Sequence, residues 1–124
     1  MAAAQQLSHV YPIGSRVSAS GRLEVGGCDT VELAREFGTP CFVVAEDDIR
    51  VRARAFVQAF AARTDDFEVV FASKAFPCTA VYRLLWDEGI GCDVAGAGEL
   101  ALALAAGVAP EAGRLVSRRP TRPM

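Results

Sequence analysis

A single lysine, Lys74, lies in the apolar stretch FASKAF at 71–76, directly after the strand-forming residues EVV. Burying an unpaired charge is costly, so this side chain should either reach solvent or use its amine for chemistry. The pKa of a lysine amine is about 10.4 in water, and apolar neighbours lower it, which leaves a neutral and nucleophilic amine. Such an amine condenses with aldehydes, which suits a Schiff base with pyridoxal phosphate, a cofactor that stabilises carbanions. The plainer alternative is a solvated residue at the end of a strand.

Asp93, in the stretch GCDVAGAGE, is the second candidate, because it ends the next predicted strand. Functional groups of parallel α/β proteins lie at the carboxyl ends of strands. On an adjacent strand, Asp93 could pair with Lys74 or orient an imine; it could equally cap the helix that begins near Gly96. Gly98 and Gly96 could let a ligand approach the backbone, although GAGE is too short to be a phosphate-binding fingerprint. Glu99 suits the N-terminus of a helix.

Strand and helix patterns alternate along the chain that must position these groups. Asp29 and Gly38 are suitable caps for a first helix, and Ala53, Phe56 and Phe60 recur at helical spacing in a second one. We predict helices at 29–37, 46–63, 77–89 and 96–107, and strands at 39–45, 67–72 and 90–94, with a fourth strand possible at 113–117 and a short one in GRLEVGG at 21–27. This alternation predicts a parallel sheet with right-handed crossovers.

Composition narrows the class of protein further. The 124 residues suffice for one domain, 52% of them are apolar, and the net charge of −2 gives no reason to expect a nucleic-acid partner. No apolar run approaches the roughly 20 residues that span a membrane, and the N-terminus has no secretory pattern. With one histidine, a structural zinc site is not expected, and reduced, buried thiols in the cytoplasm are the plain interpretation of the four cysteines, Cys28, Cys41, Cys78 and Cys92.

Two longer stretches resemble the beginning of the diaminopimelate decarboxylase family. They read EFGTPCFVVAEDDIR and FEVVFASKAFPCTAVYRLLWDEGIGCDVAGAGELALALAAGVAPE, and the resemblance covers about residues 22–111. FASKA matches the family's lysine pattern, and CDVAGAGE matches its aspartate strand and glycine-rich turn, with Ala97 where a glycine is common. This family belongs to the fold-type III, alanine-racemase-like pyridoxal phosphate enzymes, together with ornithine and arginine decarboxylases.

The resemblance implies an α/β fold, the N-terminal portion of a (β/α)8 TIM barrel with about three to four βα units. Residues 1–28 would be an N-terminal segment that associates with a β-domain in the full family. Residues 29–112 would be the partial barrel, and 113–124 an atypical, disordered tail. Lys74 would be the lysine that holds pyridoxal phosphate as a Schiff base, with Asp93 beside it, and the full-length family forms homodimers.

The implied reaction is decarboxylation of meso-2,6-diaminopimelate to L-lysine and carbon dioxide. The sequence turns to AGRLVSRRPTRPM where the family continues into further barrel strands, so we expect a truncated, inactive product that does not assemble normally. The alternatives are a relative of ornithine or arginine decarboxylase, a non-enzymatic protein that binds pyridoxal phosphate, and an interaction module whose partner completes the sheet.

Overall fold

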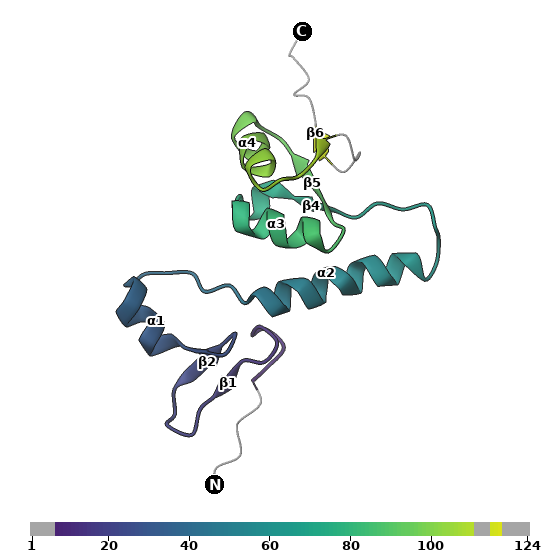
Figure 1. The fold of residues 1–124 in the computed structure, drawn as a ribbon. Coiled ribbons are helices and arrows are strands. Elements are labelled where there is room, and N and C mark those ends of the chain that lie inside the picture. The colour runs from purple at the N-terminus through teal and green to yellow at the C-terminus, as the bar shows by residue number, and fades with distance from the viewer. Residues whose placement is uncertain (1–6, 111–114, 118–124) are drawn as a thin grey trace. The chain divides into compact units, whose positions relative to one another are not determined.

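The computed structural model describes residues 7–110 and 115–117. The chain divides into two compact units, Met1–Ile49 and Arg50–Met124. Figure 1 shows the course of the chain and the labels of its elements.

The first unit contains a small antiparallel sheet with the strand order β1-β2-β3. Only the middle strand was predicted, and the flanking strands are very short. Gly26 and Gly27 connect β2 to β3 with φ angles of 58° and 81°. Positive φ at both positions is what a tight two-residue hairpin turn requires. The strands are β1 (Arg16–Val17), β2 (Leu23–Val25) and β3 (Cys28–Asp29).

Helix α1 (Thr30–Phe37) follows β3 and confirms the first predicted helix. The Asp29 carboxylate accepts hydrogen bonds from the backbone N–H groups of Val31 and Glu32, at 2.8 and 3.3 Å. These bonds satisfy donors that have no partner within the helix. Gly38 ends the helix with a φ of 82°, a conformation that favours glycine.

The strand predicted at 39–45 is wrong: residues 41–45 form none in the structure. Phe42 is 97% exposed, and Val43 and Val44 are also exposed, while Ala45 is buried. A strand is stabilised by hydrogen bonds to a neighbouring strand, and none of the described strands pairs with this segment.

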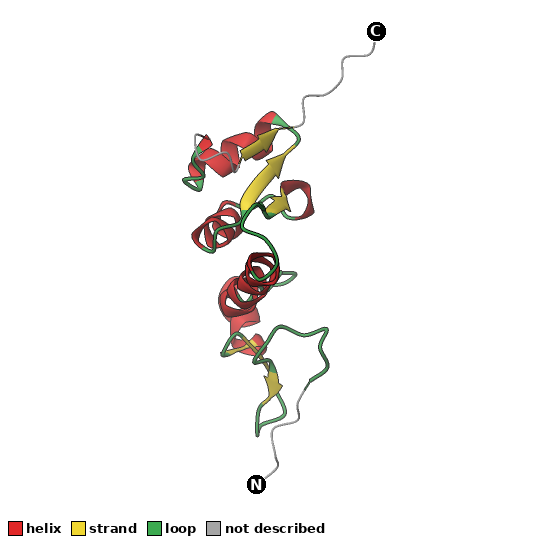
Figure 2. Cartoon of the chain, turned by 90° about the vertical axis from the view of Figure 1, so that its right-hand side faces the viewer, coloured by secondary structure: helices red, strands yellow, loops and turns green. Residues whose placement is uncertain are grey.

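The second unit is built on a parallel sheet with the order β4-β5-β6. Each strand leads through a helix to the next strand, and Figures 1 and 2 show α3 and α4 on one side of the sheet. This arrangement confirms the predicted α/β class. The elements are α2 (Glu46–Ala61, shared with the first unit), β4 (Val70–Ala72), a 3-10 turn (Ser73–Ala75), α3 (Thr79–Asp87), β5 (Gly91–Val94), α4 (Ala97–Ala105) and β6 (Leu115–Ser117).

Strand β6 settles whether a fourth strand exists near 113–117. Its residues Leu115, Val116 and Ser117 pair in register with Cys92, Asp93 and Val94 of β5. The expectation of a disordered tail is therefore wrong for these three residues, because their backbone groups gain partners in a sheet. The remaining residues of the predicted tail, 113–114 and 118–124, lie outside the described residues.

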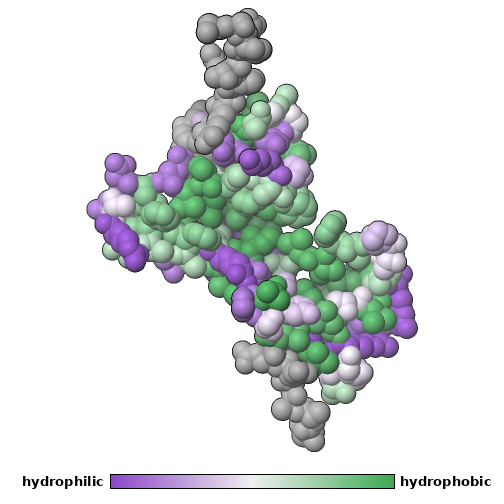
Figure 3. All heavy atoms as spheres, turned by 180° about the vertical axis from the view of Figure 1, so that it is seen from behind, coloured by the Kyte–Doolittle hydropathy of each residue, from purple (hydrophilic) through white to green (hydrophobic). Residues whose placement is uncertain are grey.

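The core of the second unit lies between β5 and the two crossover helices. Its buried side chains are Tyr82, Cys92, Val94, Ala103, Ala106 and Val108. Helix α2 contributes less than its pattern predicted, because only Ala53 is buried, whereas Phe56 and Phe60 are 61% and 49% exposed. Hydrophobic residues are accordingly visible on the surface in Figure 3.

An ion-pair network joins α2 to the end of α3. The Glu88 carboxylate accepts hydrogen bonds from Arg54, at 2.5 and 2.8 Å, and from Arg50, at 2.9 Å. These hydrogen bonds, with that from Arg54 the strongest, lower the pKa of Glu88 from 4.5 to about 2. Charge-assisted bonds from two guanidinium groups stabilise the ionised carboxylate.

The four cysteines do not share one environment, so the expectation of buried thiols is only partly right. Cys92 is buried and Cys78 is half-buried, but Cys28 and Cys41 are exposed. Within the described residues, no helix combines the length and the apolar character that crossing a membrane requires.

Candidate active site

A pocket of about 300 Å³ opens at the carboxyl ends of β4 and β5. Its lining includes the one lysine of the chain together with two acidic side chains. Parallel strands bring their carboxyl ends to the same edge of a sheet, so residues distant in sequence meet there. The lining residues are Ala72, Lys74, Asp93, Ala95 and Glu99.

Lys74 lies in the 3-10 turn that follows β4, as its position at the end of a strand predicted. Its side chain is exposed, and so are Ala72, Ala75 and Phe76, which corrects the expectation of an apolar setting. Phe71 is not among the residues that line the pocket, and its ring makes an edge contact with Tyr82, with ring centroids 6.3 Å apart. The ammonium thus reaches solvent and the pocket without the cost of burial.

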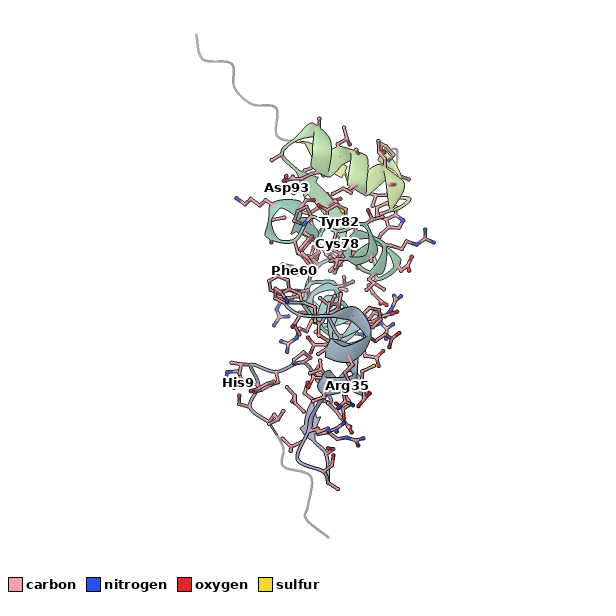
Figure 4. All side chains as sticks on the ribbon, turned by 90° about the vertical axis from the view of Figure 1, so that its left-hand side faces the viewer. His9, Arg35, Phe60, Cys78, Tyr82 and Asp93 are labelled. Carbon is pink, nitrogen blue, oxygen red and sulfur yellow. The ribbon has the colours of Figure 1, made fainter. Side chains whose placement is uncertain are left out.

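Asp93 lies on β5, where it is level with Ala72 of β4 in the parallel register. Its side chain is half-buried and faces the same pocket as Lys74. Within the described part of the chain, the two side chains form no ion pair. Figure 4 labels Asp93, Tyr82 of the neighbouring helix α3 and Cys78, the residue directly before that helix.

The alternative role for Asp93, a cap for the following helix, is wrong. The cap residue of α4 is Gly96, and no side chain caps it. Instead the Glu99 carboxylate accepts a hydrogen bond from the backbone N–H of Ala95, at 2.7 Å. A glutamate in the first turn that bonds to the chain before the helix resembles half of a capping box. Asp93 therefore lines the pocket without capping α4.

Glu99 lines the pocket, although its position in the sequence predicted only a role at the N-terminus of a helix. Its place in the first turn of α4 was anticipated, but not its position on the wall of the pocket beside Asp93. The available signal was its distance from the end of β5, because the first turn of a crossover helix lies at the same edge of the sheet as the strand end before it.

The glycines of the GAGE stretch are not required by packing within the described chain. A Cβ atom added to Gly96 or Gly98 would meet no atom within 4 Å, and neither glycine has a positive φ. A close approach of a ligand to this backbone therefore stays a prediction.

A second pocket, of about 410 Å³, lies in the first unit. Its lining is mainly apolar, with Cys28, Glu46 and Asp47 as the reactive or charged members. It holds no amine that could bind an aldehyde. Among the described residues, no cluster of three or more histidine, cysteine or acidic side chains is placed to hold a metal ion.

The chemistry available in the lysine pocket is that of an accessible amine in a pocket that two carboxylates also line. The amine can form a bond to an aldehyde, and a carboxylate beside it can accept or return a proton. These residues fit the aldehyde end of pyridoxal phosphate. The pocket lining supplies no cation other than Lys74 for a phosphate group.

The fold and the pocket thus define an α/β protein with an exposed lysine amine at the carboxyl edge of a parallel sheet. The sequence model of one family, described as "Pyridoxal-dependent decarboxylase, pyridoxal binding domain", matches residues 46–122. The chain belongs to the pyridoxal-dependent decarboxylase family, and its cofactor is pyridoxal phosphate, as the sequence predicted.

Known relatives carry the name that the resemblance suggested. The chain is 48% identical over 102 residues to diaminopimelate decarboxylase of Actinosynnema pretiosum subsp. auranticum, and 43% identical over 97 residues to that of Bacillus subtilis (strain 168). These alignments cover 82% and 78% of the chain but 22% of each relative. The chain therefore spans about a fifth of the length of these relatives.

Solved structures agree with this assignment. Diaminopimelate decarboxylase from M. jannaschii superimposes with a TM-score of 0.74 at 32% identity, over 84% of this chain and 24% of that protein. AQ1208 from Aquifex aeolicus superimposes with a TM-score of 0.69 at 32% identity, over 86% of this chain and 25% of that protein.

Proposed function

We propose that residues 46–117 form the lysine-bearing part of the cofactor site in a diaminopimelate decarboxylase, with Lys74 as the residue that bonds to pyridoxal phosphate. One observation carries the proposal: the Lys74 amine and the Asp93 carboxylate line one pocket at the carboxyl ends of adjacent parallel strands. The family match supports it, because the matched residues include both side chains.

The roles of the side chains follow from their positions. Lys74 would hold the aldehyde, since its amine is exposed to the pocket. Asp93 would orient that amine and exchange protons with it, because β5 brings the carboxylate to the same pocket wall. When bound, the cofactor withdraws electrons from the substrate α-carbon, so that its bond to the carboxylate can break with release of carbon dioxide.

The substrate we propose is meso-2,6-diaminopimelate and the product L-lysine. The named relatives support this choice, and one related protein, the M. jannaschii enzyme, was solved in co-complex with L-lysine. Ornithine and arginine are the alternative substrates, because the matched family description specifies a decarboxylase but not its amino acid.

The larger architecture belongs to the same proposal. The alternation of β4, α3, β5, α4 and β6 supports a place in a (β/α)8 barrel, with residues 29–112 as the barrel portion and 1–28 associated with a β-domain. Homodimer formation and a cytoplasmic location are proposed for the protein as a whole, by analogy with the family.

A cofactor trap tests the role of Lys74. Pyridoxal phosphate is titrated into the chain, the bond is reduced with borohydride, and the modified peptides are mapped by mass spectrometry. We expect labelling at Lys74 that saturates at low cofactor concentration and is lost in denaturant. The amine of Met1 in the same sample reports non-specific labelling, and Lys74→Arg keeps the charge without forming the bond.

Labelling at Lys74 that rises linearly with cofactor concentration and persists in denaturant would contradict the proposal, because it would mark a merely accessible amine. Release of carbon dioxide from diaminopimelate, compared with ornithine and arginine, tests the substrate. If all three fail while Lys74 labels saturably, the chain is a cofactor-binding protein without decarboxylase activity.

A further inference from the structure

The turn that carries Lys74 is attached to the core by a side chain from another element. The hydroxyl of Tyr82, on α3, donates a hydrogen bond to the carbonyl oxygen of Ser73, at 3.3 Å. The same carbonyl accepts a hydrogen bond from the backbone N–H of Phe76, at 3.2 Å. Both bonds converge on the residue directly before the lysine.

Tyr82 is itself firmly held. Its side chain has an exposed fraction of 0% and belongs to the buried core cluster, together with Cys92 of β5. The ring of Phe71, on β4, meets it at an interplanar angle of 62°. Leaving a buried hydroxyl without a partner has a desolvation cost, and the bond to Ser73 is the one that the Tyr82 hydroxyl makes among the described residues, so it is favoured wherever the core is intact.

The turn has two distinct sides as a result. Ser73 is completely buried, while Lys74, the next residue, is exposed and lines the pocket. The lysine side chain is a flexible four-carbon stem, so the position of its amine depends on how firmly its backbone is fixed. Fixing that backbone from the core side reduces the number of positions that the amine samples.

We propose that Tyr82 is a positioning residue, whose hydroxyl fixes the Ser73–Ala75 turn and thereby presents the Lys74 amine to the pocket. This inference rests on the proposed function, in which that amine binds pyridoxal phosphate. It is a role in orienting the lysine, and Tyr82 does not itself line the pocket.

The test uses Tyr82→Phe, which keeps the ring and removes only the hydroxyl. We expect the cofactor concentration for half-saturation of Lys74 to rise by about two- to fivefold, the range that one modest hydrogen bond provides. We also expect faster hydrogen exchange at the amide of Phe76. Tyr11→Phe is the matched control, because Tyr11 is the other tyrosine and is 40% exposed.

A second control separates positioning from stability. Val108→Ala removes methyl groups from another member of the core cluster, with 2% exposure, and leaves the hydroxyl in place. At a temperature where every variant is folded, lost stability alone leaves the half-saturation concentration unchanged, because almost all molecules stay competent to bind. Only a displaced amine raises it.

Three outcomes are decisive. Unchanged half-saturation and unchanged exchange at Phe76 in Tyr82→Phe would overturn the inference, as would an equal rise in folded Val108→Ala. Absence of saturable labelling in the unaltered chain would instead overturn the proposed function and with it the role of Tyr82 toward the cofactor. The exchange measurement, which needs no cofactor, would still show whether Tyr82 holds the turn.

Discussion

Val94→Ala should destabilise the second unit strongly, because Val94 is 1% exposed and belongs to its core cluster. The change removes two buried methyl groups, at about 0.8 kcal/mol each for transfer to water. The cavity left behind adds to this cost, which gives about 2–3 kcal/mol in total. For a unit of this size, such a loss lowers the melting temperature by roughly 10–20 °C. Asp93 precedes Val94 on β5, so the experiment tests the strand that carries the pocket acid.

The assay is thermal unfolding followed by circular dichroism, with urea unfolding at constant temperature as a second measurement. Val10→Ala makes the same chemical change at a side chain that is 77% exposed, and should be nearly neutral. A shift for Val94→Ala no larger than that for Val10→Ala would refute the reasoning. It would mean that β5 is not packed as described, and the placement of Asp93 would fall with it.

Three further predictions concern single side chains of the same unit. Glu88→Gln should lower the stability at neutral pH, and the difference from the unaltered chain should vanish as the pH falls from 4.5 to about 2, because the two arginines stabilise only the ionised carboxylate. Unfolding curves across this pH range check it, and a difference that stays constant would count against the network. Ser73→Ala should leave the melting temperature unchanged or raise it, because the buried Ser73 hydroxyl has no hydrogen-bond partner among the described residues. A clear decrease of the melting temperature in calorimetry would disprove this. Cys92 should react with a thiol reagent far more slowly than the exposed Cys28, since burial raises the pKa of the Cys92 thiol. Peptide mapping measures the two rates in the folded chain, and equal rates would contradict the burial of Cys92.

Local signals made the helices predictable. Asp29 and Gly38 lie at the two ends of α1, as their residue types suggested, because capping bonds involve only nearby residues. The two-residue strands β1 and β3 have no periodicity to detect, although the consecutive glycines Gly26 and Gly27 are a hairpin signal that was available. The apolar run at 41–45 was wrongly predicted as a strand, since a hydrophobic pattern does not reveal whether a neighbouring strand pairs with the segment.

The sequence allowed two residues of the site to be predicted, but not how far their side chains are exposed. Lys74 and Asp93 lie in one pocket because the ends of adjacent parallel strands meet, which the strand order in the sequence already implied. The exposure of Lys74 was not predictable, because it depends on contacts made only in the folded chain, such as that of the neighbouring Phe71 ring with Tyr82. The anchoring of the turn by Tyr82 depends on the same tertiary packing.

The pocket lining has a consequence for how the site is assembled and inherited. All of its residues fall between Ala72 and Glu99, within one strand-helix-strand unit and the first turn of the next helix. During synthesis from the N-terminus, every side chain of the pocket is therefore present once residue 99 has been added to the chain, before residues 115–117 of β6 are added. A gene rearrangement that moves this short stretch carries the amine and both acids with it, already in the spacing that brings them together.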